Sequence, residues 1–239
     1  MVANWFSRRT RRTDVPRLRL RSDDLATTKV DLVEFTPDLP GFLGRAAYVQ
    51  LMIFENLSWA MSTAPSTAAK TTIGRAAELS LARHRSLVDE ITRGGGDAAA
   101  AMEPYTAVVD RLQQATRGAD WYENLVTCYL TSGFLDDFFA RLARGLPTDA
   151  AHRVSAIYAT DSGEALLGEL LVQAIEEQPR LASRLAMWGR RLVGDTMLVA
   201  RSALQYTENH RSDEARIEPV FTELIAAHTR RMDRLGLTA

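Results

Sequence analysis

Cysteine and lysine are nearly absent from this chain of 239 residues. Cys128 is the only cysteine, so neither an intramolecular disulfide nor a cysteine-based zinc site can form, which fits a reducing compartment. Lys29 and Lys70 are the only lysines, and all other basic residues apart from histidine are arginines. The sequence also lacks an apolar run near the ~20 residues that span a bilayer, and its N-terminal residues lack the apolar core of a signal peptide. We therefore predict a soluble, cytoplasmic protein.

Positive charge is concentrated at the N-terminus. Residues 1–22 hold seven arginines and one acid, a local charge of +6, so the rest of the chain carries −7 within the total of −1. We divide the chain into a basic segment, residues 1–26, and a folded domain, residues 27–239. The residues of the basic segment that we expect to bind a partner are Trp5, Phe6, Arg8, Arg9, Arg11, Arg12, Arg17, Arg19 and Arg21.

Three interpretations of the basic segment stay open. It is a solvated tail, or it binds RNA through arginine–phosphate contacts with Trp5 stacked on a base. In the third interpretation it docks on an anionic membrane surface or a protein partner, with Trp5 and Phe6 as apolar anchors. That last interpretation would place the protein peripherally at a membrane.

Beyond the basic segment the sequence predicts helices separated by short breakers, with no convincing strand alternation and no internal repeat. Prolines, glycines and capping residues set the boundaries. Long helices with short connections are typical of a helical bundle, so we predict an all-α fold. The predicted helices span about residues 40–63, 65–94, 97–118, 120–142, 148–177, 180–210 and 214–235.

Polar and small residues interrupt the apolar stripes of these predicted helices. In the stretch ELSLARHRSL (78–87), helical spacing places Leu81 and His84 on the stripe that should face inward. Burial of a polar group costs free energy unless the group is hydrogen-bonded, and small residues in a core leave room for a cavity. The sequence therefore predicts a residual pocket at the centre of the bundle, lined by Gln50, Leu81, His84, Ser132, Thr160 and Gly163.

Three stretches of the chain resemble an actinobacterial branch of the ferritin-like superfamily, similar to the tRNA 2-methylthio-N6-isopentenyladenosine hydroxylases. They are AAYVQLMIFENL (46–57), EPYTAVVDRLQQATRGADWYENLVTCYLTSGFLDDFF (103–139) and QPRLASRLAMWGRRLVGD (178–195). The resemblance covers roughly residues 40–236 and implies a ferritin-like four-helix bundle with additional C-terminal helices.

In that family a di-iron centre is held by one glutamate from each of two helices and a Glu-x-x-His pair from each of the other two. The resemblance carries these ligands to the six residual-pocket positions, where only the imidazole of His84 remains and no carboxylate is present. One imidazole cannot hold two irons, which require several carboxylate oxygens. The expected function is therefore a non-catalytic binding or adaptor protein with a degenerate di-iron site and no cofactor.

In an alternative interpretation the chain is an enzyme with a metal site. A shift of one residue would replace Thr160 and Gly163 by Asp161 and Glu164, and with His84 these acids could hold one divalent ion. The chain would then be a non-haem iron oxygenase that hydroxylates a modified tRNA nucleoside, with Glu78 as a further displaced ligand. Iron storage is a weaker third interpretation, since it requires ferroxidase carboxylates.

Overall fold

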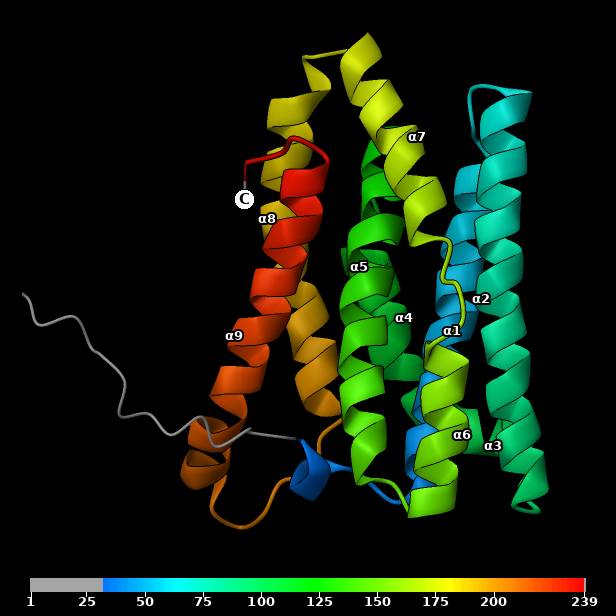
Figure 1. Cartoon of the computed structure of the whole chain (residues 1–239), viewed down its shortest axis with the longest axis vertical. Coiled ribbons are helices and arrows are strands. Elements are labelled where there is room, and N and C mark those ends of the chain that lie inside the picture. The colour runs from blue at the N-terminus through cyan, green and yellow to red at the C-terminus, as the bar shows by residue number, and fades with distance from the viewer. Residues whose placement is uncertain (1–31, 239) are drawn as a thin grey trace, which may run out of the picture.

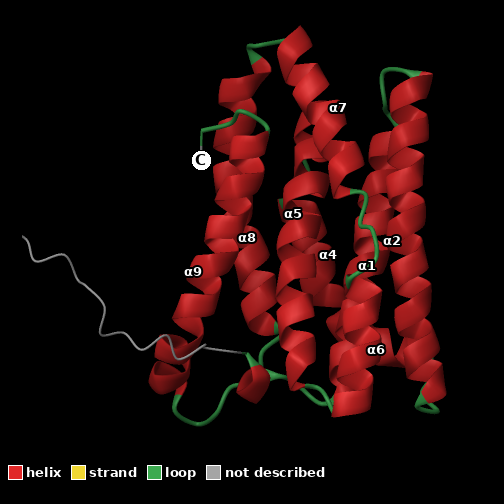
Figure 2. Cartoon of the chain, viewed as in Figure 1, coloured by secondary structure: helices red, strands yellow, loops and turns green. Residues whose placement is uncertain are grey.

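The computed structural model describes residues 32–238, and within that range every regular element is a helix (Figure 1). Figure 2 shows these helices joined by short loops. The all-α prediction is confirmed. In chain order the elements are η1 (Val33–Phe35), α1 (Leu39–Ser62), α2 (Thr67–Arg93), α3 (Ala98–Met102), η2 (Glu103–Tyr105), α4 (Thr106–Ala115), α5 (Trp121–Leu142), η3 (Ala143–Gly145), α6 (Thr148–Tyr158), α7 (Glu164–Glu177), α8 (Leu181–Ser202) and α9 (His210–Arg234).

Side-chain caps explain where several of the long helices begin. Asp38 precedes α1 and accepts a hydrogen bond from the backbone N–H of Gly41 at 3.0 Å. Ser66 caps α2 and Asp120 caps α5 in the same way. Such caps satisfy backbone donors that have no partner inside the helix. None of the described helices is long and apolar enough to cross a membrane.

Four helical positions surround the centre of the bundle. Helices α1 and α2 form a closely packed hairpin, and α5 packs against α1. Helices α6 and α7 share the fourth position, and each contacts both α2 and α5 (Figure 1). Helices α8 and α9 pack on α5 from outside this group of four. The apolar side chains form one continuous core from Leu32 to Leu237.

The predicted helix over residues 148–177 is two helices in the structure. Helix α6 ends at Tyr158, and α7 begins at Glu164 after a left-handed residue, Gly163, with φ of +75°. A Cβ on Gly163 would lie 2.9 Å from the Cβ of Ala76 on α2, so the chain turns here in close contact with its neighbour.

Two other predicted helices also differ from the structure. The helix expected over residues 97–118 is divided into α3 and α4 by the short η2, which contains Pro104. The helix expected to reach residue 210 ends at Ser202. The following segment leaves the helix, and its Gln205 donates a backbone hydrogen bond to the carbonyl of Phe35 at 2.9 Å.

Candidate functional site

A buried ion pair lies at the centre of the bundle. Arg83 projects from α2, and its side chain is only 4% exposed. Its Nη1 lies 2.6 Å from Oδ2 of Asp136 on α5. Because desolvation of two charges is expensive, such a pair is stable only when further hydrogen bonds satisfy its remaining donors and acceptors.

The second carboxylate oxygen of Asp136 is also engaged. Gln50 on α1 is buried, and its Nε2 donates to Oδ1 of Asp136 at 2.7 Å. Burial raises the pKa of the Asp136 carboxyl, while the guanidinium of Arg83 and the amide of Gln50 oppose that shift. Three helices are thus connected through one carboxylate.

The remaining donors of Arg83 bind the break between α6 and α7. Its Nε donates to Oγ1 of Thr160 at 3.1 Å, and its Nη2 donates to the carbonyls of Tyr158 (3.3 Å) and Thr160. The last carbonyls of a helix lack partners within it and carry partial negative charge, so a guanidinium is well suited to this place. We call Gln50, Arg83, Asp136 and Thr160 the central polar cluster.

Aromatic rings cover one side of the central polar cluster. The ring of Tyr158 is stacked on Phe139 with centroids 6.3 Å apart, and the guanidinium of Arg83 lies 5.9 Å from the Tyr158 centroid. Burial raises the pKa of the Tyr158 hydroxyl, and the charge of Asp136 adds to that shift. Tyr158 therefore stays neutral and acts as an apolar cover for the ion pair.

The fold and the centre of the bundle can be compared with known proteins. The model of the ferritin-like domain family of actinomycetes matches residues 34–210 of the chain. The chain belongs to this family. No curated protein matches the sequence significantly. The ferritin-like domain therefore includes α1 to α8 and the whole central polar cluster, whereas α9 lies beyond the matched residues except for its first residue, His210.

The ferritin-like domain brings together only two of the six predicted pocket residues, Gln50 and Thr160. Leu81 is half-buried and lies outside the central polar cluster. His84 is also half-buried, and its Nδ1 donates to the carbonyl of Ala47 at 2.9 Å. Ser132 donates to the carbonyl one turn earlier in its own helix, and Gly163 forms the turn before α7.

The difference on α2 is a rotation of the buried face by about one residue. The face that contacts the core holds Ala76, Ser80, Arg83 and Leu87, whereas the sequence pattern predicted Leu81 and His84 there. Arg83 was not predicted to face inward because an arginine on a helix is ordinarily exposed. The available signal was an arginine that shares an apolar stripe with alanines and leucines.

Three of the four alternative metal ligands have other partners. Asp161 accepts a hydrogen bond from the backbone of Gly163, and Glu164 is paired with Arg231 and Arg234. His84 is directed to the backbone of α1, as described above, and Glu78 is exposed on α2. Across residues 32–238, no group of three or more His, Cys, Asp or Glu side chains could hold a metal ion.

A cavity of about 270 Å³ lies between α1, α4 and α5, away from the central polar cluster. None of the predicted pocket residues lines it. Its walls include Asn56, Trp59, Gln113 and Arg117, and its floor includes the buried thiol of Cys128. Burial raises the pKa of this thiol to about 12, so Cys128 is an inert core residue.

The partner-binding residues expected in the basic segment, from Trp5 to Arg21, lie outside the described residues. The described residues begin at Leu32, next to η1. There Glu34 pairs with Arg216 of α9, and the guanidinium of Arg216 lies 5.3 Å from the centroid of Phe35. The start of the described chain is therefore fixed against the N-terminal part of α9.

Proposed function

We propose that this ferritin-like domain is a non-catalytic binding or adaptor protein in which an arginine takes the central place of a metal. The observation that supports this most directly is the ion pair between Arg83 and Asp136. A di-iron centre requires several carboxylates that are free to bind the metal. The central polar cluster has one carboxylate, and both of its oxygens already accept hydrogen bonds from protein side chains.

The residues at the centre therefore do not fit two irons. Metal ions would be placed beside a guanidinium that is always charged, and like charges repel strongly where water is excluded. Removal of Arg83 would also leave the carbonyls at the end of α6 without their donor. The guanidinium of Arg83 is thus part of the fold, and a metal ion could bind at the centre only by displacing it.

The alternative function is the hydroxylation of a modified tRNA nucleoside by a non-haem iron centre. The resemblance of the three sequence stretches to the tRNA hydroxylases favours it, and the side chains at the bundle centre oppose it. The displaced acids Asp161 and Glu164 would have to give up their present partners and move toward His84 to form such a centre.

The charge distribution supports a binding role. Seven arginines in residues 1–22 provide a cationic segment that is suited to an anionic surface, and we propose that this segment attaches the domain to its partner. We expect the full-length protein to bind anionic vesicles and the variant with all seven arginines changed to glutamine to lose that binding. If the full-length protein binds RNA and not vesicles, the proposal that its partner is an anionic membrane surface is wrong.

Metal analysis tests the absence of a di-iron centre. Untagged full-length protein, produced with added iron, should contain far less than one iron per chain. A stoichiometry of about two irons per chain, lost on His84→Ala, would overturn the proposal in favour of the hydroxylase. A matched pair of variants sharpens the result: Arg83→Glu removes the central cation, and Arg153→Glu reverses a more exposed arginine that pairs with Glu90. Only Arg83→Glu should increase iron binding.

A further inference from the structure

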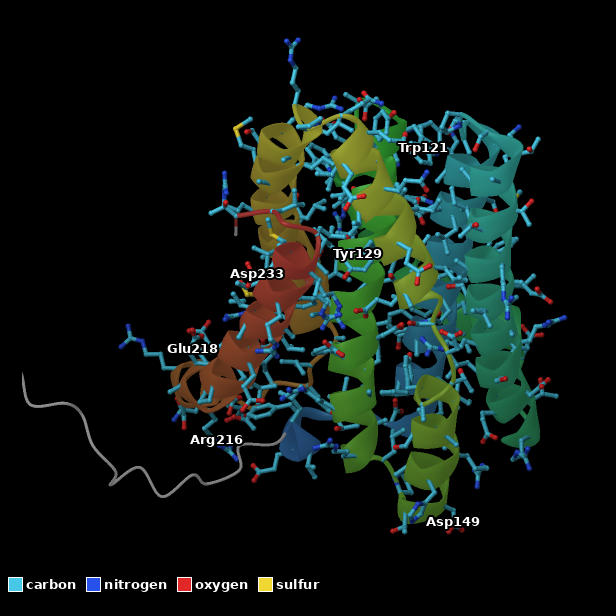
Figure 3. The ribbon with its side chains drawn as sticks, turned by 45° about the horizontal axis from the view of Figure 1, so that its top comes forward. Trp121, Tyr129, Asp149, Arg216, Glu218 and Asp233 are labelled. Carbon is cyan, nitrogen blue, oxygen red and sulfur yellow. The ribbon has the colours of Figure 1, made fainter. Side chains whose placement is uncertain are left out.

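A groove of about 690 Å³ separates α7 from α9 on the surface of α5. Both helices pack on α5, and Figure 3 shows Tyr129 of α5 between them. One face of α7 forms a wall of the groove from Glu164 to Glu176, and Arg234 and Leu235 lie on the opposite side. At the helical rise of 1.5 Å per residue this wall is about 18 Å long.

The floor of the groove is apolar and its rim is acidic. Tyr129, Ala165, Val172 and Leu235 contribute the apolar lining. The carboxylates of the rim come from Asp161, Glu164, Glu169 and Glu176, against the single guanidinium of Arg234.

Two of these carboxylates are available to a cationic ligand. Glu164 is already paired with Arg231 and Arg234, at the end of the groove where α7 begins. Glu169 and Glu176 are exposed and form no ion pair with any residue in the range 32–238. A ligand that matches the groove must therefore combine apolar groups with positive charges.

The chain itself contains such a segment at residues 17–21, with the sequence RLRLR. In an extended backbone, side chains alternate between two sides, so three arginines would lie on one side and two leucines on the other. Five extended residues span roughly 17 Å, about the length of the α7 wall.

The segment can also reach the groove. The described chain begins at Leu32, beside Arg216 of α9, and the groove lies near Arg234 of the same helix. These two arginines are about 27 Å apart along the helix axis. Residues 22–31 can span up to about 35 Å when extended, which covers that distance.

We propose that residues 17–21 of this chain dock in the groove between α7 and α9. The leucines lie on the apolar floor, and the arginines pair with Glu169 and Glu176. Docking would cover the arginines that the domain presents to an anionic partner, so the groove and the partner compete for one segment. The groove, the charges and the reach carry this inference, and none of them depends on the absence of a metal centre.

Photo-cross-linking of the full-length chain tests the docking. Ser22→Cys places a thiol next to the segment, and a benzophenone attached there reacts with whatever lies nearby. Cys128 is buried, so the labelling is selective; the chain without the new cysteine checks this. We expect cross-links to α7 between Ala165 and Glu176, or to the end of α9, and a yield that falls at high salt because exposed charges are screened.

Two matched pairs of variants make the result specific. Glu169→Gln with Glu176→Gln should reduce the yield about threefold or more, whereas the exposed acids of α2 changed in Glu78→Gln with Asp89→Asn should not. Three arginines of the segment changed to glutamine (Arg17, Arg19 and Arg21) should act like the first pair, and the same change at Arg8, Arg9 and Arg12 should leave the yield nearly intact.

Other occupants of the groove would be recognised in the same experiment. Cross-links that join isotopically heavy chains to light chains in a mixture would show that the segment docks on a second copy, which contradicts the proposal. If the cross-linking yield fell equally in both members of a variant pair, the attraction between the charges would be unspecific. This result would also overturn the proposed docking. Neither result would alter the iron content of the protein, so the proposed function is tested separately.

Discussion

The charged side chain of Arg83 is 4% exposed and lies inside the bundle, so its replacement should destabilise the fold. Arg83→Met would leave the Asp136 carboxylate buried with Gln50 as its remaining partner and would free the carbonyls at the end of α6. Breaking a buried pair on one side typically costs 3–5 kcal/mol, so we expect the free energy of unfolding to fall by about 3 kcal/mol or more. Urea denaturation followed by circular dichroism measures this change.

An ion pair with a more exposed arginine provides the control. The side chain of Arg153 is 40% exposed and lies 2.8 Å from Glu90, and the buried Glu90 carboxylate also pairs with Arg93 at 3.2 Å. Because Arg93 remains as a partner of Glu90, Arg153→Met should cost about 1 kcal/mol, less than Arg83→Met. The double variant Arg83→Met with Asp136→Asn should cost less than the sum of its two single changes, because the buried charge is gone. Additive losses would show that Arg83 and Asp136 are not energetically coupled.

His228 should make the stability of the domain depend on pH. Its imidazole is buried between α9 and α8, where Nε2 donates to the carbonyl of Gly189 at 3.0 Å. Burial lowers the pKa of His228 below its ordinary 6.5, and the charge of Arg231 acts in the same direction. At low pH the unfolded chain binds a proton at His228 more readily than the folded state does. The contribution of neutral His228 to the free energy of unfolding is therefore complete above about pH 6.5 and is lost as the pH falls below that value.

Denaturation of wild type and His228→Gln at pH 7.5 and pH 5.5 measures this contribution. We expect the wild type to lose more stability between the two pH values than the variant, in which the titrating group is absent. An equal loss in both proteins would assign the pH dependence to other residues.

At single positions, the sequence correctly predicted that Gln50 is a polar residue in the core. It did not predict which of two adjacent residues on α2 faces the core. Gln50 was found because an amide on an apolar stripe is unusual, and the structure places it in the central polar cluster. Adjacent residues on a helix differ by about 100° in direction, so a small error of register exchanges them. Arg83 and His84 were exchanged in this way, and Asp136 faces Arg83 whereas its neighbour Asp137 pairs with Arg231.

At the scale of elements, helix starts were predictable because caps are local, but the apolar periodicity did not reveal the break between α6 and α7. The carbonyl-rich turn is stabilised by Arg83, which is 77 residues away in sequence from Thr160. Close approach to α2 at Gly163 is likewise a contact between distant segments. The apolar periodicity continues across residues 148–177. The local sign of the break is the turn sequence Asp161-Ser162-Gly163, in which Asp161 and Ser162 accept hydrogen bonds from the backbone N–H groups of Gly163 and Glu164.

The turn at Gly163 can be tested against a glycine in an open position. Gly163→Ala combines a left-handed backbone with a Cβ placed against Ala76, and should destabilise the domain by about 1–3 kcal/mol. Gly194 lies inside α8, where an added Cβ would meet no heavy atom within 4 Å, so Gly194→Ala should stabilise the domain by about 0.5–1 kcal/mol. Thermal unfolding of the two variants measures both. Similar shifts of the same sign would show that the turn tolerates a side chain.

On the scale of the whole molecule, the outer helices are attached to the bundle by buried contacts. Trp188 of α8 donates from Nε1 to Oγ1 of Thr127 on α5 at 2.9 Å. Arg231 of α9 has a side chain that is 8% exposed and pairs with Asp137 on α5 and Glu164 on α7. Helix α9 after His210 lies beyond the residues matched by the family, and these contacts make it part of the same structural unit.

This attachment predicts one cooperative unfolding transition. Apart from Trp5, which lies outside the described residues, the tryptophans are Trp59 in α1, Trp121 in α5 and Trp188 in α8. Tryptophan fluorescence therefore reports mainly on these three helices, whereas far-ultraviolet circular dichroism reports on all helices. Because one core connects them, both signals should change at the same urea concentration, and Arg231→Met should move both midpoints down together. An early loss of circular dichroism in Arg231→Met, with the fluorescence midpoint unchanged, would instead show that α9 unfolds separately from the four-helix bundle.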